Sequence, residues 1–308
     1  MKLIRTAREL NPGAQKVCAA IGVFDGVHLG HQQVIRQTVN DAAQQEGLAV
    51  VVTFDQHPNC IVAPKRVPPL IYSPPQKLRA IASLQADALL LIHFDEAFSR
   101  QPGEEFIRGL ARDFHSLHSV CVGSSFTFGH RRSGDVALLK KLGTELNFQV
   151  HGLAAVSLDG QVVSSTRIRE AIRSGQLDAA SQMLGRAYSL SGLVIRGDQL
   201  GRELGFPTAN LDPTGLVLPP PGVYAVHARV RDRSHRGVLN IGFRPTLHPP
   251  QPQIRVEAHL LDFNGDLYEQ DLEIIFVGKL REECSFPSLP ELQAQIARDI
   301  REARRMFG

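Results

Sequence analysis

Two histidines three residues apart stand at a glycine-rich turn near the start of the chain. They are His28 and His31 within KVCAAIGVFDGVHLGHQ, residues 17–33. The apolar beginning of this stretch predicts a buried strand, and apolar side chains at three- and four-residue spacing after His31 predict a helix. A strand that turns through glycines into a helix N-terminus directs backbone N–H groups and the helix dipole at one point. We therefore expect a phosphate site here, with Gly30 leaving room for the anion between the imidazoles.

Two simpler interpretations of these histidines stay open. The rings can merely cap the helix, or they can bind a metal ion. An HxxH pattern without an evident third ligand is weak support for zinc. The strand before the turn and the helix after it favour the phosphate site.

A second candidate site lies in GDQLGRELGFPTANL, residues 197–211. Its glycines allow the backbone to wrap a phosphate chain, and they are Gly197, Gly201 and Gly205. Thr208 and Asn210 offer oxygen ligands for Mg²⁺. The stretch contains no GK[ST], so it is not a Walker A loop.

A carboxylate stands out in IRVEAHLLDF, residues 254–263. Strand alternation places Val256 and Ala258 on one face and Glu257 on the other, together with Arg255 and His259. Because the apolar face packs, Glu257 faces either solvent or a site. By pattern alone, a solvated strand face is the more usual outcome.

These candidate sites fall in two regions of different texture. In residues 1–185, apolar strands alternate with amphipathic helices, which predicts a parallel sheet with helices on both faces. The expected strands after the first are 48–54, 88–94, 118–123 and 148–152, and the expected helices include 74–85, 102–114, 135–146 and 176–184. Ligands of such sheets bind beyond the carboxyl ends of the strands. We therefore predict a Rossmann-like α/β domain for this half.

In residues 186–308 glycine and proline are frequent, and the apolar pattern alternates. Strands are expected at 190–197, 222–230, 237–242, 254–263 and 271–277. Short strands separated by turns predict a small antiparallel β-barrel, and 289–307 predicts a terminal amphipathic helix. The domain boundary is predicted between residues 185 and 186.

Composition narrows the class of protein. The chain has 308 residues, 43% hydrophobic and 21% charged, with a net charge of +3 and no dense basic block. These values are ordinary for a globular protein, favour anionic small molecules, and give no indication of nucleic-acid binding. The N-terminus lacks a signal-peptide core, the apolar runs are too short to span a bilayer, and the four cysteines have no CxxC spacing. We expect a cytoplasmic protein, monomeric or a weak homo-oligomer, with inert thiols and no membrane partner.

The segment GVFDGVHLGHQ resembles the first motif of the bacterial bifunctional riboflavin kinase/FMN adenylyltransferases, also called FAD synthetases. Further segments resemble this family in the same order along nearly the whole chain. They are TFDQHP (53–58), GSSFTFGHRRSG (123–134), SSTRIR (164–169), GRELGFPTAN (201–210), GFRPT (242–246), VEAHLLDFNGDLY (256–268) and the tail FPSLPELQAQIARD (286–299). Two positions depart from the family pattern: Gln56 replaces a usual proline and Ser125 a usual acid.

The resemblance implies that the N-terminal domain joins FMN to AMP from ATP, releasing pyrophosphate. His28 and His31 would stabilise the α-phosphate region. Residues implied to bind ATP and its phosphates are Gly22, Phe24, Asp25, Gly30, Ser165, Thr166 and Arg169. Residues implied to bind the flavin are His57, Ser125, Phe126, Phe128 and Arg132.

The hydroxyls of Ser165 and Thr166 also have a purely structural interpretation, because either is a natural N-cap for the helix that follows. Capping does not account for Arg167 and Arg169 in the same turn, where the helix dipole disfavours cations unless an anion binds. Phosphate binding is therefore favoured.

For the C-terminal domain, the resemblance implies an ATP-dependent riboflavin kinase. Glu257 would be the general base, Thr208 and Asn210 would hold Mg²⁺, and the loop glycines would bind ATP together with Thr208. Three alternatives remain: a riboflavin kinase with a degenerate adenylylation site, a flavin-binding protein without turnover, and a nucleotidylyltransferase for another phosphorylated substrate.

Overall fold

The computed structural model describes residues 1–231, 233–243 and 254–308. Two compact units are present: Met1–Pro69 with Pro74–Ser165, and Leu70–Ser73 with Thr166–Gly308. The division falls inside a helix, earlier than the predicted domain boundary between 185 and 186. That boundary remains a prediction about which segment serves which activity.

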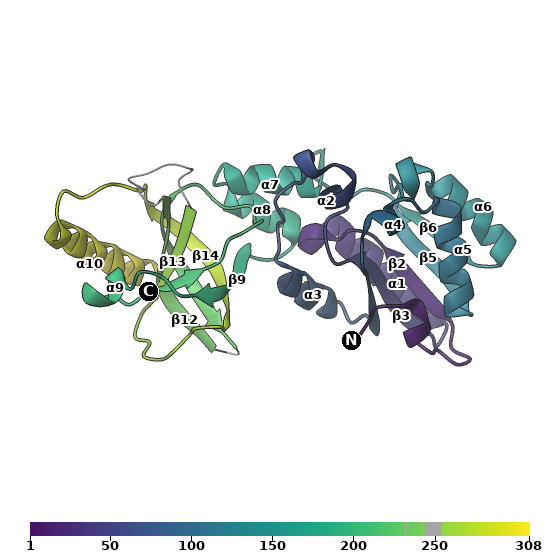
Figure 1. Cartoon of the computed structure of the whole chain (residues 1–308), viewed down its shortest axis with the longest axis horizontal. Coiled ribbons are helices and arrows are strands. Elements are labelled where there is room, and N and C mark those ends of the chain that lie inside the picture. The colour runs from purple at the N-terminus through teal and green to yellow at the C-terminus, as the bar shows by residue number, and fades with distance from the viewer. Residues whose placement is uncertain (232, 244–253) are drawn as a thin grey trace. The chain divides into compact units, whose positions relative to one another are not determined.

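The first unit is built on a six-stranded parallel sheet with strand order β1-β4-β3-β2-β5-β6. Four of these strands, β2, β3, β5 and β6, are labelled in Figure 1. The strands are β1 (Lys2–Ile4), β2 (Val17–Ile21), β3 (Leu48–Phe54), β4 (Ala88–Ile92), β5 (Leu117–Gly123) and β6 (Gln149–Leu153). From β2 the chain proceeds in one direction to β3 and β4, and later in the other direction to β5 and β6. A crevice therefore forms at the carboxyl ends of β2 and β5, where ligands of such sheets bind.

Helices cover both faces of this sheet, as predicted. They are α1 (Leu29–Gln44), α3 (Pro74–Ala82), α5 (Gly103–Phe114), α6 (Val136–Leu146) and the short α2 (Asn59–Val62) and α4 (Glu96–Ser99). On one face Val50 packs with Ile107 of α5 and Leu139 of α6. On the other face Val51 packs with Ile35 of α1 and Ile81 of α3. Burial on both sides explains why the strands are continuous apolar runs. A two-stranded hairpin, β7 (Ser157–Leu158) and β8 (Gln161–Val162), was not predicted.

The second unit contains a closed antiparallel barrel with strand order β10-β13-β12-β11-β14-β9. The strands are β9 (Ser189–Ile195), β10 (Ala209–Leu211), β11 (Gly222–Val230), β12 (Arg233–Phe243), β13 (Ile254–Leu260) and β14 (Asp271–Arg281). The helices are α7 (Ser165–Arg173), α8 (Leu177–Leu184), α9 (Leu200–Glu203) and α10 (Leu289–Met306). The predicted fold class, a Rossmann-like α/β domain followed by a small barrel with a terminal helix, is confirmed.

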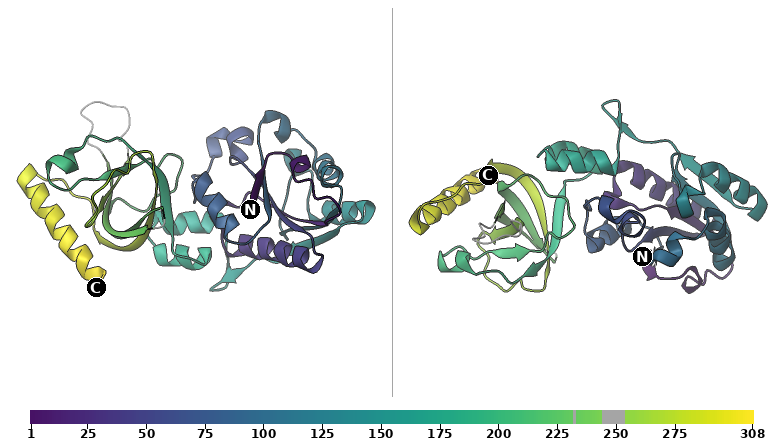
Figure 2. Two further views of the ribbon diagram at one scale, coloured as in Figure 1. Left: turned by 90° about the horizontal axis from the view of Figure 1, so that it is seen from below. Right: turned by 45° about the horizontal axis from the view of Figure 1, so that its top comes forward.

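Helix α10 lies along the outside of the barrel, where it is the yellow helix in Figure 2. Its Ala303 packs against Val223 and Val238 on the outer barrel face. Asp299 accepts hydrogen bonds from Arg281 Nε (3.0 Å) and Nη2 (2.8 Å), which join α10 to β14. The helix and the outer face of the barrel can therefore enclose a site between them.

In the described part of the chain, no helix combines the length and apolar character needed to cross a bilayer.

Two candidate active sites

The turn after β2 is held in an unusual backbone conformation. Phe24 (φ 52°), Gly26 (φ 76°) and Val27 (φ 42°) all lie in the left-handed region. Non-glycine residues rarely adopt this conformation, and it concentrates at ligand sites where the surrounding fold enforces it. Gly22 permits the arrangement, because a Cβ atom there would lie 2.9 Å from the buried ring of Phe24. The turn leads directly into α1.

The two histidines stack at the start of α1, with ring centroids 3.6 Å apart and planes 20° apart. His28 is the N-cap residue, and its Nδ1 accepts a hydrogen bond from the backbone N–H of His31 at 3.4 Å. The capping interpretation is therefore correct for His28. Capping is compatible with an anion site, because a neutral imidazole that accepts at Nδ1 carries its proton on Nε2 and can donate it in a hydrogen bond to an anion. A Cβ at Gly30 would lie 3.2 Å from His28 Cε1, so glycine keeps this helix start uncrowded.

The loop before α1 is hydrogen-bonded to Ser165, the last residue of the same unit. Ser165 Oγ donates a hydrogen bond to the carbonyl oxygen of buried Asp25 at 3.1 Å. Helix α7 begins at Ser165, so Ser165 and Thr166 lie inside the helix and the N-cap expectation was wrong by one residue. Thr166 is exposed and Arg169 is buried. Their contact with ATP phosphates stays a prediction.

An aromatic pocket of about 890 Å³ lies at the carboxyl ends of the parallel strands. The phenylalanines that line it are Phe54, Phe94, Phe98, Phe106, Phe126 and Phe128. Successive rings lie close together, for example Phe54 and Phe94 with centroids 5.3 Å apart. Flat aromatic walls of this kind suit a planar ring system.

Most of the predicted flavin-binding residues meet at this pocket. His57, Phe126, Phe128 and Arg132 line it, whereas Ser125 is exposed and does not. The other four phenylalanines lie outside the motifs that predicted a flavin site. A usable signal existed for two of them, because Phe54 ends β3 and Phe94 follows β4 by two residues.

Hydrogen bonds join the ends of β3 and β4 beneath the pocket. Asp55 accepts from His93 Nδ1 at 2.6 Å and from the Phe94 N–H at 3.1 Å. Burial opposes ionisation of Asp55, but these hydrogen bonds hold its pKa below the ordinary value. Gln56 Nε2 donates to the Phe94 carbonyl at 2.7 Å. Glutamine at this position therefore adds a hydrogen bond between the two strand ends.

A lysine outside the predicted motifs lies beside the end of β3. Lys77 of α3 donates to the Phe54 carbonyl at 2.8 Å and lies 3.4 Å from Thr53 Oγ1. Burial lowers the pKa of Lys77 to about 8, although Asp25 and Asp55 favour its charged form. The sequence held a signal, because Lys77 is four residues before buried Ile81 and so interrupts the apolar face of the helix.

In the barrel unit, the three predicted loop glycines each have a physical reason. A Cβ at Gly197 would lie 2.3 Å from Asn210 Nδ2, and one at Gly201 would lie 2.5 Å from the Phe206 carbonyl oxygen. Gly205 has φ 84°, which disfavours other residues. The loop consequently lies against the segment that carries Asn210.

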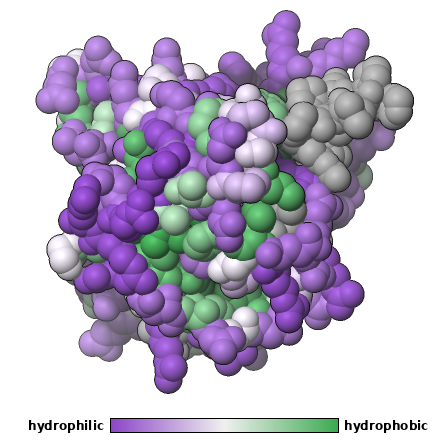
Figure 3. All heavy atoms as spheres, turned by 90° about the vertical axis from the view of Figure 1, so that its left-hand side faces the viewer, coloured by the Kyte–Doolittle hydropathy of each residue, from purple (hydrophilic) through white to green (hydrophobic). Residues whose placement is uncertain are grey.

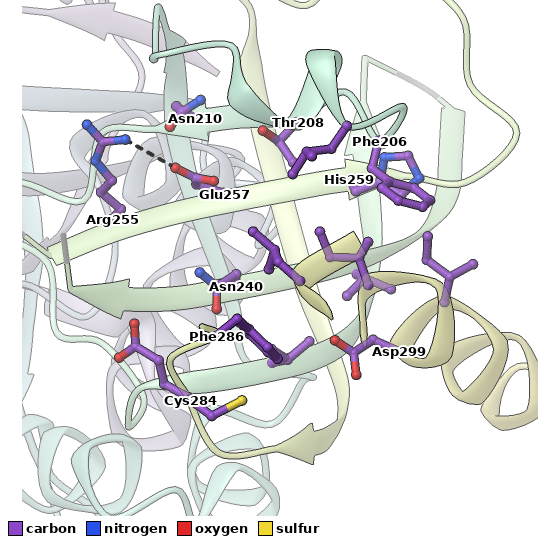
Figure 4. Close-up of a pocket in the computed structure, with 18 of the residues that line it drawn as sticks. Phe206, Thr208, Asn210, Asn240, Arg255, Glu257, His259, Cys284, Phe286 and Asp299 are labelled. Carbon is purple, nitrogen blue, oxygen red and sulfur yellow. Dashed lines mark hydrogen bonds and ion pairs between the residues drawn. The ribbon is translucent and has the colours of Figure 1, made fainter. Parts of the chain in front are cut away.

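A row of polar side chains crosses three strands on the outer face of the barrel. In the strand register Glu257 of β13 pairs with Asn210 of β10 on one side and with Asn240 of β12 on the other. Figure 4 shows Glu257 and Arg255 pointing toward one another beside Asn210. The side chain of Glu257 is 28% exposed and lines a pocket together with Thr208. The predicted alternation is correct, since Val256 and Ala258 lie in the barrel core.

This second pocket has a volume of about 280 Å³ and combines the polar row with an apolar wall. The apolar wall includes Phe206, Val223, Val238, Phe286, Leu292, Ile296 and Ile300. Three of these side chains come from α10. In Figure 3, which views the side of the barrel unit that carries α10, apolar side chains gather near the centre and hydrophilic ones surround them. A ligand here can be apolar at one end and phosphorylated at the other.

Among the described residues, no group of three or more His, Cys, Asp and Glu side chains is placed to hold a metal ion. Of the kinase motifs, residues 244–246 of GFRPT lie outside the described part of the chain.

Comparison with known proteins matches each half of the chain to a protein family. The family described as FAD synthetase matches residues 11–167, and the family described as riboflavin kinase matches residues 184–307. The bifunctional riboflavin kinase/FMN adenylyltransferase of Escherichia coli (strain K12) is 37% identical over 100% of this chain and 98% of its own length. The protein of the same name from Buchnera aphidicola subsp. Schizaphis graminum is 33% identical over 100% of this chain and 99% of its own.

A solved structure shares the architecture of the whole chain. A crystal structure described as a macrolide-efflux protein from Streptococcus pneumoniae covers 99% of both chains with a TM-score of 0.81 and 26% identity. The family matches and the full-length relatives cover both halves of the chain. The chain belongs to the bifunctional riboflavin kinase/FMN adenylyltransferase family.

Proposed function

We propose that the barrel site phosphorylates riboflavin to FMN and that the site at the start of α1 adenylylates FMN to FAD. ATP is the co-substrate of both reactions. The observation that carries this assignment is a carboxylate beside oxygen donors in the barrel pocket and stacked imidazoles at a helix N-terminus in the first unit.

In the kinase step, Glu257 accepts the proton of the ribityl 5′-hydroxyl of riboflavin. The resulting oxygen nucleophile bonds to the γ-phosphorus of ATP, the bond from that phosphorus to the β,γ-bridging oxygen breaks, and ADP leaves. The apolar wall under α10 holds the flavin, and the loop of Gly197, Gly201 and Gly205 follows the phosphates. Positioning and charge stabilisation supply the rate.

The oxygen atoms of Thr208 and Asn210 fit Mg²⁺. This cation takes oxygen ligands and commonly uses one or two protein ligands together with substrate phosphates and water. Both side chains line the pocket next to Glu257. When bound, Mg²⁺ would offset the negative charge of the phosphates.

In the adenylylation step, a phosphate oxygen of FMN bonds to the α-phosphorus of ATP, the bond to the pyrophosphate oxygen breaks, and pyrophosphate leaves. The phosphate nucleophile is already an anion, so no general base is required. His28 and His31 donate toward the α-phosphate together with the helix N-terminus. Ser165, Thr166 and Arg169 are proposed to bind the β- and γ-phosphates. The aromatic pocket stacks the flavin, with His57 and Arg132 at its edge.

Separation of flavins by chromatography tests the assignment. The full-length protein is incubated with ATP and Mg²⁺ plus either riboflavin or FMN, with samples lacking ATP as controls. We expect FMN and then FAD from riboflavin, and FAD from FMN. FMN as the only product would favour a kinase with a degenerate adenylylation site. No conversion, with tight FMN binding, would favour a flavin-binding protein.

A further inference from the structure

A guanidinium that the proposed mechanism does not use lies beside the general base. Arg255 Nη1 is 2.9 Å from Asp198 Oδ2 and 3.5 Å from Glu257 Oε1. Asp198 belongs to the glycine-rich loop, and its side chain is 49% exposed. The guanidinium therefore connects the loop that follows the phosphates of ATP to the strand that carries the base.

Acidic side chains outnumber guanidinium groups in the described lining of the pocket. Its described lining contains four carboxylates, Asp198, Glu257, Glu283 and Asp299, but only two guanidinium groups, Arg255 and Arg281. Arg281 is already paired with Asp299, to which its Nε and Nη2 donate hydrogen bonds of 2.8–3.1 Å. A triphosphate that enters this pocket adds further negative charge next to unneutralised carboxylates.

Arg255 is placed to change partners. Its closer partner, Asp198, is half-exposed on a loop, and ion pairs with so much solvent contact are weak. A phosphate, by contrast, accepts two parallel hydrogen bonds from a guanidinium. Exchange of Asp198 for a phosphate oxygen would therefore be favourable.

We propose that Arg255 is a further catalytic residue of the kinase step, which binds the γ-phosphate of ATP and has Asp198 as its partner in the nucleotide-free protein. This inference rests on the proposed riboflavin kinase activity of the barrel. As the bond from the 5′-oxygen to the γ-phosphorus forms and the bond to ADP breaks, the guanidinium stabilises the charge on the transferred phosphoryl group. The proton still goes to Glu257, so Arg255 itself neither gains nor loses one.

The test compares variants of the full-length protein in the conversion of riboflavin to FMN. Arg255→Gln should lower kcat/KM for MgATP by about 10- to 100-fold, the effect of losing charge-assisted hydrogen bonds. Arg255→Lys, which keeps the charge but not the fork, should recover part of this loss. Riboflavin binding and the FMN-to-FAD rate of the same polypeptide should stay unchanged. The matched control is Arg229→Gln, since Arg229 pairs with Glu273 on the barrel at 3.3 Å and does not line the pocket.

Asp198→Asn separates catalysis from simple structural pairing. It removes the competing partner, so KM for MgATP should fall by about two- to fivefold, the range of an exposed ion pair. If the pair only held the loop in place, Asp198→Asn and Arg255→Gln would impair the kinase alike, and the inference would be overturned. An active wild-type protein whose Arg255→Gln variant is unaffected would overturn the inference alone. A wild-type protein that makes no FMN would overturn the kinase assignment as well.

Discussion

The two candidate sites use the same co-substrate but supply different chemistry. At the start of α1 the groups are stacked imidazoles and backbone donors, with no carboxylate side chain assigned to accept a proton. On the outer face of the barrel a carboxylate, Glu257, lies between two asparagines. The difference follows from the nucleophile. A phosphate group attacks as an anion and needs only stabilisation, whereas a hydroxyl must lose a proton as it attacks.

The sites also differ in how the chain assembles them. In the first unit, one continuous stretch forms the strand end, the left-handed turn and the helix start that position His28 and His31. In the barrel, the site depends on register among β10, β12 and β13, which are distant in sequence. If these two constructions act independently, a change in one site should leave the reaction of the other unaffected.

Loss of the carboxylate should affect the kinase alone. Glu257→Gln keeps the size of the side chain but removes the proton acceptor, so kcat for FMN formation should fall by about 10²- to 10⁴-fold. Conversion of supplied FMN to FAD should keep its wild-type rate. Quantifying both products by chromatography checks this. Retention of wild-type kinase activity would exclude Glu257 as the base.

The converse effect is expected at the start of α1. His28→Asn replaces the imidazole with another good N-cap residue, so helix stability should be largely preserved. Pyrophosphate release with FMN and ATP should fall by about 10²- to 10³-fold, as on removal of a donor to a developing charge. Riboflavin phosphorylation is the internal control. An unchanged rate of pyrophosphate release would leave His28 with the capping role only.

The partly buried Lys77 should make the stability of the first unit depend on pH. The pKa of Lys77 is lowered to about 8, against 10.5 for the ordinary side chain. Below pH 8 both the folded and unfolded chains carry this proton, and the cost of burying the charge is fully present. As pH rises from 8 to 10.5 the unfolded chain binds more protons, so the unfolding free energy due to this group increases.

Urea denaturation of wild type and Lys77→Met across this pH range checks the prediction. The stability of the wild type relative to the variant should rise with pH. A constant difference between the two proteins would show that Lys77 does not titrate there.

The smallest effect is expected at Ser125, one of the two positions that depart from the family pattern. Ser125 is exposed and does not line the aromatic pocket. Ser125→Asp should therefore change KM for FMN by less than about threefold, the range of an exposed charge. Ser124→Asp is the neighbouring control. A tenfold improvement specific to Ser125→Asp would show that this serine limits adenylylation.

The sequence predicted much of the fold because its signals are local. Apolar runs predicted five of the six parallel strands, all except the three-residue β1, and the strand 222–230 matches β11 at both ends. The strand β10 was not predicted, because three residues are too few to show an alternating pattern. The family, the fold class and both activities predicted from the motifs are confirmed by the comparisons. The roles of individual site residues remain predictions.

What the sequence left out depends on contacts between distant segments. Asn240 enters the barrel site only through its register opposite Glu257. Arg255 was placed on the correct face of its strand, but its pairing with Asp198 needs the fold of the glycine-rich loop. The four additional phenylalanines converge because separate strands and helices end at one edge of the sheet. Local patterns therefore identify motifs, whereas register and packing determine which side chains complete them.

The most direct test of the division of chemistry is the set of flavins formed by Glu257→Gln and His28→Asn from riboflavin and MgATP, each alone and mixed. We predict that His28→Asn stops at FMN and that Glu257→Gln makes FAD only when FMN is supplied. The mixture should make FAD from riboflavin, because each variant retains the site that the other lacks. Loss of both activities in either single variant would contradict two independent sites.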